Sequence, residues 1–191
     1  MGKKKIIIGI SGASGAIYGV RLLEILKNYE DVETHLVISD TAKEIIQYEC
    51  YRDPDEVIDL ADIVYPINNL WASISSGSFL TEGMIIAPCS IKSLSGIGNS
   101  YNDNLLIRAA DVCLKERRKL IIVLRETPLH LGHLELMVRV TRYGATILPP
   151  SPSFYHKPKT IDDLINQTVG KILDNFGIGH NLFTRWEIEG E

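Results

Sequence analysis

Short apolar runs alternate along this chain with longer segments in which apolar residues recur every three to four positions. The short runs are of the kind seen in strands buried on both faces, and they lie at residues 5–10, 33–39, 84–87, 120–124 and 145–148. The longer segments have the spacing of helices with one buried face, and they lie at residues 16–28, 41–49, 104–118, 131–143 and 161–175. Gly177 is the predicted stop of the last helix.

This alternation predicts right-handed βαβ crossovers and a mostly parallel sheet with helices on both faces. We therefore expect a three-layer α/β fold of the flavodoxin or Rossmann kind. Residues 1–191 form one predicted domain, because no internal repeat or low-complexity linker divides them. Such folds bind ligands at the carboxyl ends of their strands. The segments to inspect there are residues 11–15, 39, 89–93, 125–127 and 151–155.

Composition narrows the class of protein. With 24 acidic and 20 basic residues, the net charge of −4 argues against nucleic acid as a partner. No apolar run approaches the ~18 residues of a membrane span. The first run, after Lys3–Lys5, is about five residues long, against the ~7–15 of a signal peptide. The three widely spaced cysteines form no CxxC pair, which predicts a reducing cytoplasm and no cysteine-rich zinc site.

The loop after the first strand, Gly9-Ile-Ser-Gly12-Ala-Ser-Gly15, leads directly into a helix. Its small residues and the free N–H groups of the helix start favour an anion, and we expect a ligand phosphate on residues 12–15. The loop lacks the GK[ST] ending of a P-loop and matches the dinucleotide fingerprint only loosely. With Asp40 as a candidate ribose ligand, a dinucleotide remains an alternative, as does a turn that needs glycine only for packing.

Serine hydroxyls gather at two further places. Ser90 and Ser93 stand at the predicted helix start after the third strand, where they either cap the helix or bind a polar ligand. The serine-rich segment, residues 73–78, offers more hydroxyls that would close over such a ligand. Hydroxyls suit a phosphate or a flavin edge better than a metal. His130 and His133 do not form an HExxH motif, so a metal is not expected.

Charged residues form two patterns. A narrow stripe on the helix at 104–118 is either a solvated face with paired charges or the lining of a pocket or subunit seam; it comprises Asn104, Arg108, Asp111, Lys115 and Arg118. Arg125 and Glu126 follow a buried strand, where we expect a buried charge pair that is either structural or functional. Cys89 has no evident activating histidine and is not expected to be a nucleophile.

Six motifs, in this order, resemble those of the UbiX-type flavin prenyltransferases, and the resemblance runs from Lys5 to Trp186. They are GISGASGAIYGVRLLE at 9–24, SISSGSF at 73–79, PCSIKSLSGI at 88–97, DNLLIRAADVCLKERR at 103–118, RETPLHLGHL at 125–134 and PPSPSFYHKP at 149–158.

The resemblance implies a metal-independent enzyme that joins the dimethylallyl group of dimethylallyl phosphate to N5 and C6 of reduced FMN. The product, prenylated FMN, is the cofactor of UbiD-type decarboxylases, which become the expected recipients. The family also forms dodecamers, so we expect a homo-oligomer with the flavin at a seam between protomers.

The resemblance also assigns residues. Those matching flavin contacts are Gly12, Ala13, Ser14, Ser39, Ser90, Ile91, Lys92, Ser93 and Arg125. Lys115, Tyr155 and Lys171 match the residues that hold the prenyl phosphate. Some relatives carry arginine in place of Lys171, so the fork geometry is lost here. Ser14, Glu49 and Glu126 are the candidate catalytic residues, with Glu126 expected to handle protons. Trp71 receives no role.

Two rival functions share the fold. A peptidyl-cysteine decarboxylase would carry a catalytic histidine in the first helix region, and residues 16–28 contain none. A flavodoxin-like electron carrier without catalysis would not need a second anion site formed by Lys115, Tyr155 and Lys171.

Overall fold

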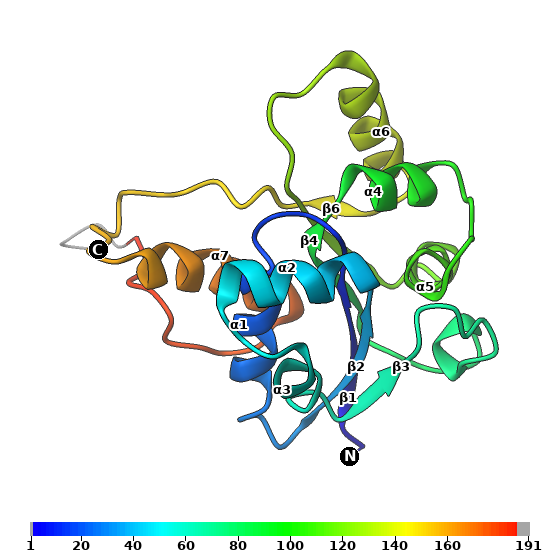
Figure 1. Ribbon diagram of the computed structural model, residues 1–191, viewed down its shortest axis with the longest axis horizontal. Coiled ribbons are helices and arrows are strands. Elements are labelled where there is room, and N and C mark those ends of the chain that lie inside the picture. Colours follow the sequence, from blue (N-terminus) through cyan, green and yellow to red (C-terminus); the bar gives the residue numbers. More distant parts are fainter. Residues whose placement is uncertain (1, 187–191) are drawn as a thin grey trace.

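A parallel sheet of six strands forms the centre of the computed structural model, which describes residues 2–186. The strand order is β3-β2-β1-β4-β5-β6, and every pair is parallel (Figure 1). The strands are β1 (Lys4–Ile10), β2 (Val32–Ile38), β3 (Ile63–Tyr65), β4 (Gly83–Cys89), β5 (Lys119–Leu124) and β6 (Thr146–Ile147). All strands therefore end at one edge of the sheet, as the predicted crossovers require.

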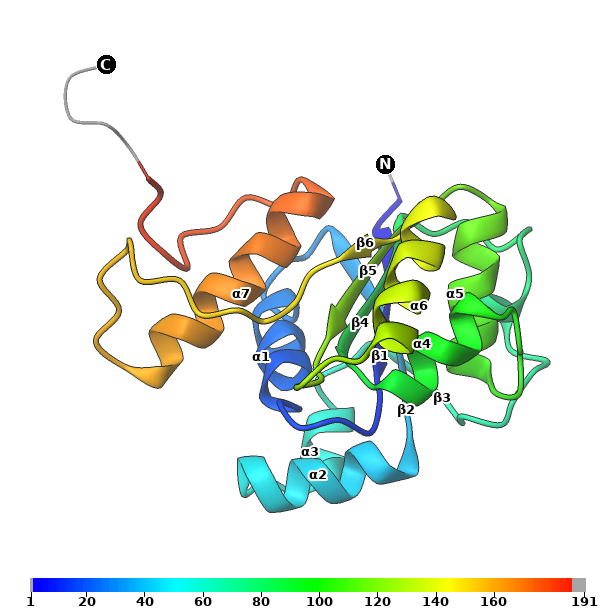
Figure 2. The ribbon, with the colours of Figure 1, turned by 90° about the horizontal axis from the view of Figure 1, so that it is seen from above.

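Helices cover both faces of the sheet and make the three layers seen in Figure 2. The first face carries α1 (Ile17–Leu26), α2 (Asp40–Cys50), α3 (Pro54–Ile58) and α7 (Ile161–Phe176). The second face carries α4 (Ile91–Gly98), α5 (Leu105–Lys115) and α6 (Leu131–Arg142), with the short 3-10 helix η1 (Ser73–Ser75) beside α5. No helix in the described part of the chain is both long and apolar enough to cross a bilayer.

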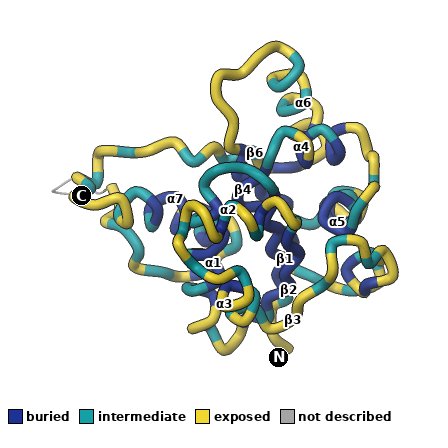
Figure 3. Tube along the Cα trace, viewed as in Figure 1, coloured by how far each residue is buried: buried dark blue, intermediate teal, exposed yellow. Residues whose placement is uncertain are grey.

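Each face of the sheet has its own apolar core (Figure 3). Along β1, Ile6, Ile8 and Ile10 belong to the core of the first face and Ile7 to that of the second. Successive side chains of a strand point to opposite faces, so a strand buried on both sides reads as a continuous apolar run. This is why the sequence pattern predicts the central strands well.

Every predicted strand and helix is present, with small changes at the ends. The helix predicted to reach residue 118 ends at Lys115, because Arg117 turns the chain with a φ of 56°. Gly177 ends α7 as predicted, with a φ of 66°.

Four short elements were not predicted: α3, β3, η1 and α4 beyond its start at Ser90. β3 is a three-residue edge strand with Ile63 and Val64 exposed, so it leaves no continuous apolar run. α4 contains Gly96, which disfavours a helix in isolation. A Cβ there would meet the side chain of Ile107 at 2.5 Å, so the glycine lets α4 approach α5 closely.

Candidate active site

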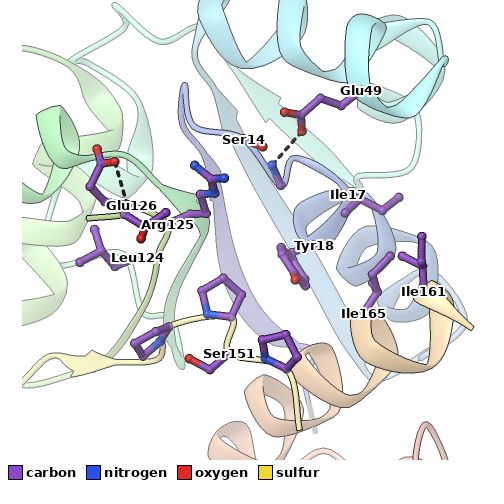
Figure 4. A pocket seen from close by; sticks show the side chains of 15 residues that line it. Ser14, Ile17, Tyr18, Glu49, Leu124, Arg125, Glu126, Ser151, Ile161 and Ile165 are labelled. Carbon is purple, nitrogen blue, oxygen red and sulfur yellow. Dashed lines mark hydrogen bonds between the residues drawn. The ribbon is translucent and has the colours of Figure 1, made fainter. Parts of the chain in front are cut away.

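Two neighbouring cavities lie at the carboxyl edge of the sheet. We call the first, of about 660 Å³, the proline-walled cavity. It is lined by Ser14, Gly15, Ile17, Tyr18, Glu49, residues 124–127, Pro149, Pro150, Ser151, Pro152, Ile161 and Ile165 (Figure 4). The second, of about 310 Å³, is the serine-walled cavity. It is lined by Ser11, Gly12, Ser39, Thr41, Ile67, residues 90–93, Asn104, Leu106 and Glu126. Glu126 lines both cavities and therefore stands at their boundary.

The loop after β1 is fixed to its neighbours by Ser11, which is 2% exposed. Its hydroxyl donates to the carbonyl oxygen of Pro88 at 3.0 Å and accepts from the backbone N–H of Ser90 at 2.8 Å. A Cβ at Gly12 would meet Thr41 at 2.8 Å, so the loop also passes close to α2. The sequence placed Ser11 at the ligand edge but gave it no role, and it missed Thr41, because the contacts of both residues are with segments distant in sequence.

The loop that leads into α1 holds a carboxylate of the chain itself, one residue before the N-cap Ala16. The backbone N–H of Gly15 donates to Oε2 of Glu49 at 2.8 Å. A helix N-terminus stabilises negative charge through its free N–H groups and its dipole. The backbone N–H of Gly15, which the sequence predicted to bind a phosphate, is therefore already hydrogen-bonded within the chain. This leaves the Gly12–Ser14 part of the loop for a ligand.

Two of the serines that line the serine-walled cavity, Ser39 and Ser90, are helix caps as well. Ser39 Oγ accepts from the N–H of Ala42 at 3.2 Å, at the start of α2. Ser90 Oγ accepts from the N–H of Ser93 at 3.3 Å and donates to Ser93 Oγ at 3.2 Å. The capping interpretation is thus confirmed for Ser90, whereas Ser93 supplies the N–H that is capped. Capping fixes the direction of the Ser39 and Ser90 hydroxyls.

The expectation of a buried pair between Arg125 and Glu126 was wrong. Both side chains are exposed, and no ion pair joins them among the described residues. The Glu126 carboxylate accepts instead from the N–H of Thr127 at 2.9 Å. The reason is that β5 ends at Leu124, so the next residues leave the sheet and enter the cavities. Burial raises the pKa of the nearby Tyr18 phenol, against opposing effects of Thr168 and Arg125, so this phenol stays neutral.

The three predicted phosphate ligands line neither cavity of their own chain. Lys115 pairs with Glu116 and lines a separate cavity of about 570 Å³ with Arg117, Arg118 and Arg142. Tyr155 is 43% exposed, and its ring packs edge-to-face on Trp186 with centroids 5.9 Å apart. Lys171 is exposed on α7.

The charged stripe predicted over residues 104–118 holds the serine-rich segment. Arg108 Nε donates to the carbonyl oxygen of Ser75 at 3.1 Å, and its guanidinium pairs with Asp111 at 2.9 Å. Arg118 donates to the carbonyl oxygen of Phe79 at 2.7 Å. The segment thus lies along α5 and lines neither cavity of its own chain, so it does not close over a ligand there.

Three further candidates have structural explanations. Asp40 is the first residue of α2 and is exposed, with its Oδ1 3.9 Å from Nζ of Lys43. Cys89 is fully buried, which raises the pKa of its thiol to about 12 and keeps it protonated. His130 caps α6 by accepting from the N–H of Gly132 at 3.0 Å. Within residues 2–186 there is no group of three or more potential metal ligands.

Comparison with known proteins gives close matches over almost the whole chain. The model of the family described as Flavoprotein matches residues 1–173. A flavin prenyltransferase UbiX from Thauera aromatica is 60% identical over 182 residues, covering 95% of this chain and 93% of the relative.

Two solved structures superpose closely on the fold. AnUbiX, crystallised in complex with FMN and dimethylallyl pyrophosphate, is 48% identical with a TM-score of 0.95, covering 97% of this chain and 98% of that one. A dodecameric FMN-dependent UbiX-like decarboxylase from Escherichia coli O157:H7 is 48% identical with a TM-score of 0.94, covering 96% and 99%.

Proposed function

The chain belongs to the flavoprotein family and, within it, to the UbiX flavin prenyltransferases, and from this premise we propose that it joins a dimethylallyl group to N5 and C6 of reduced FMN. One observation carries the proposal. The Gly12–Ser14 loop, Ser39 and residues 90–93 converge at one edge of the sheet, next to a larger cavity that shares Glu126 with them. The prenylated FMN would then pass to a UbiD-type decarboxylase.

The serine-walled cavity fits FMN by the chemistry of its donors. Ser39, Ser90 and Ser93 offer hydroxyls, Lys92 offers a cation, and Gly12 brings the backbone of the loop to the cavity wall. Phosphate and the polar flavin edge accept hydrogen bonds from such groups. When bound, reduced FMN supplies the nucleophilic N5 and C6.

The proline-walled cavity suits an allylic phosphate. Ile17, Ile161 and Ile165 form an apolar wall against which a prenyl chain can pack. Arg125 brings a positive charge that stabilises a departing phosphate. Glu126, at the boundary of the two cavities, can give a proton to the leaving oxygen. Ser14 and Glu49 line the same cavity on the α1 side.

We propose that Lys115 acts in the site of a neighbouring copy. Its position on α5, with the serine-rich segment beside it, separates it from both cavities of its own chain. A relative of the same fold is dodecameric, and an oligomer of this chain would bring such a surface to another protomer's cavities. Tyr155 follows the proline wall in sequence, so it belongs to the segment that borders its own chain's cavity. The cytoplasm is the proposed compartment, where the three free cysteines stay reduced.

The test is to incubate the purified protein with FMN, a reductant and dimethylallyl phosphate, and to record the mass spectrum of the extracted flavin. We expect the flavin to gain one C5H8 unit. A parallel reaction with dimethylallyl pyrophosphate, the compound in the AnUbiX complex, decides which donor is used. An unchanged flavin with both donors would refute the proposal. Loss of carbon dioxide from a peptide with a C-terminal cysteine would favour the decarboxylase alternative.

A further inference from the structure

The helix that carries Glu49 has little apolar anchoring. Of the residues of α2, only Ala42 and Ile46 are buried, and both lie in its first two turns. The last turn exposes Gln47, Tyr48 and Glu49, and α2 lies at the lower edge of the molecule in Figure 2. Ile45 and Cys50 are only partly buried against the core of the first face. Glu49 nevertheless lines the proline-walled cavity, so polar contacts add to this packing in fixing its position.

Two polar contacts fix the last turn of α2. Glu49 accepts the N–H of Gly15 at 2.8 Å. Arg52, which follows the left-handed Tyr51 at the end of the helix, donates to the carboxylate of Glu24 on α1. The end of α2 is therefore attached to α1 through Arg52 and to the loop before α1 through Glu49.

The same Glu24 continues the network to α7. Its second oxygen accepts from Arg21 Nε at 3.1 Å. The other two nitrogens of Arg21 donate to Asn166 Oδ1 at 2.7 Å and Asp162 Oδ1 at 2.9 Å. Both acceptors lie on the first two turns of α7, the turns that also supply Ile161 and Ile165 to the cavity wall. One planar guanidinium thus has all three nitrogens engaged, a geometry that lysine cannot reproduce.

We propose that Arg52, Glu24 and Arg21 form a positioning chain that holds Glu49 and the apolar wall of α7 in place around α1. This inference rests on the proposed function, in which Glu49 lines the cavity that takes the allylic phosphate. A single exposed ion pair adds little to stability, whereas a small displacement of an active-site group lowers the rate steeply. Breaking the chain should therefore slow catalysis more than it destabilises the fold.

The first test is a double-mutant cycle between Arg52→Met and Glu49→Gln, read as the single-turnover rate of flavin prenylation. We expect Arg52→Met to lower the rate roughly 3- to 30-fold in the parent protein, but less than about twofold in the Glu49→Gln background. Lys27→Met is the matched control. Lys27 is the C-cap of α1 and makes a single polar side-chain contact, from its Nζ to the carbonyl oxygen of Asp59 at 3.2 Å. Equal losses in both backgrounds would overturn the proposal.

The second test does not depend on activity. Amide hydrogen exchange, followed by mass spectrometry, reports the Gly15 N–H that Glu49 holds. Arg52→Met should speed exchange in the peptide containing Gly15, and Arg21→Met should speed it over residues 161–168, with Arg21→Lys in between. Unchanged exchange would show that the chain does not position these elements. If the parent makes no prenylated flavin but the exchange changes appear, the proposed function fails while the positioning chain stands.

Discussion

The guanidinium of Arg118 donates a hydrogen bond to the carbonyl oxygen of Gly77 at 2.5 Å, across 41 residues of sequence. This contact holds the serine-rich segment at the end of α5, beside Lys115. The exposed hydroxyls of Ser76 and Ser78 lie 2.9 Å apart there. A surface of hydroxyls and cations is thus built away from both cavities, and its use in a neighbouring copy can be tested directly.

We predict that Lys115→Met abolishes prenyl transfer but leaves FMN binding intact. Lys119→Met, in which an exposed lysine loses its contact to the carbonyl oxygen of Asn175, is the control. When Lys115→Met and Glu126→Gln chains are reassembled together, activity should return to about a quarter of the sites if copies mix at random. If the mixtures are as inactive as either variant alone, Lys115 acts in the site of its own chain.

Glu126→Gln should bind FMN normally and lose turnover on the order of 10²–10⁴-fold, because the amide cannot exchange a proton with the leaving phosphate. Glu126 lines both cavities, and its exposed carboxylate is not tied up in an ion pair with Arg125. Single-turnover kinetics with reduced FMN measures the effect. Near-normal rates would show that the carboxylate has no chemical role.

Gly15→Ala should destabilise the protein by about 1–2 kcal/mol and weaken FMN binding. Gly15 has a φ of +91°, and an added Cβ would lie 3.2 Å from the ring of Tyr18. The strain would move the N–H that Glu49 accepts. Denaturant unfolding and flavin titration measure the two effects. Gly179→Ala is the control, since its Cβ would meet nothing within 4 Å; an equal loss there would argue against strain at Gly15.

Stability should fall as the pH drops below about 6.5, the ordinary pKa of histidine. His35 is fully buried; its Nε2–H donates to Glu33 and its Nδ1 accepts from Tyr65, each at 2.9 Å. Burial lowers the pKa of His35, although Glu33 opposes the shift. The folded state therefore holds the ring neutral, and its contribution is complete above pH 6.5 and lost as the pH falls towards the lowered pKa.

The slope should reach at most about 1.4 kcal/mol per pH unit for this one proton. Unfolding free energies between pH 7 and pH 5, at fixed protein concentration, measure it. His35→Gln should reduce the slope of unfolding free energy against pH. An unchanged slope in that variant would show that other titrating groups cause the pH dependence. The pKa of Asp174 is lowered by its hydrogen bonds with Arg185. Its contribution to stability is therefore lost at a separate, lower pH, near and below pH 4.

Asp174→Asn should release the end of the described chain. The carboxylate accepts from Arg185 at 2.6 and 3.1 Å and pairs with His180 at 3.2 Å, which keeps Trp186 against Tyr155. We expect faster tryptic cleavage after Arg185, with a stability loss below about 1 kcal/mol because the pair is partly exposed. Asp31→Asn breaks an exposed pair with Lys4 elsewhere and is the control. Unchanged cleavage in Asp174→Asn would show that this pair does not hold the segment.

The sequence by itself determined the central strands, the helices between them and the edge of the sheet at which the two cavities lie. Runs such as Ile6–Ile8 are local signals, because a strand buried on both faces needs apolar residues at every position. Parallel crossovers then bring all strand ends to one edge. For that reason Gly12, Ser39, Ser90 and Glu126 could be grouped from sequence, and the structure places them around one cavity.

Only the tertiary structure decided which side chains meet between distant segments. The bond from Gly15 to Glu49, the attachment of Gly77 by Arg118 and the separation of Lys115 from both cavities depend on how the helices pack on the sheet. Apolar spacing determines which face of a helix is buried, but not where its polar residues lie along a neighbouring helix. The short edge strand β3 escaped prediction for a related reason, since its pairing with β2 stabilises it more than any apolar pattern of its own.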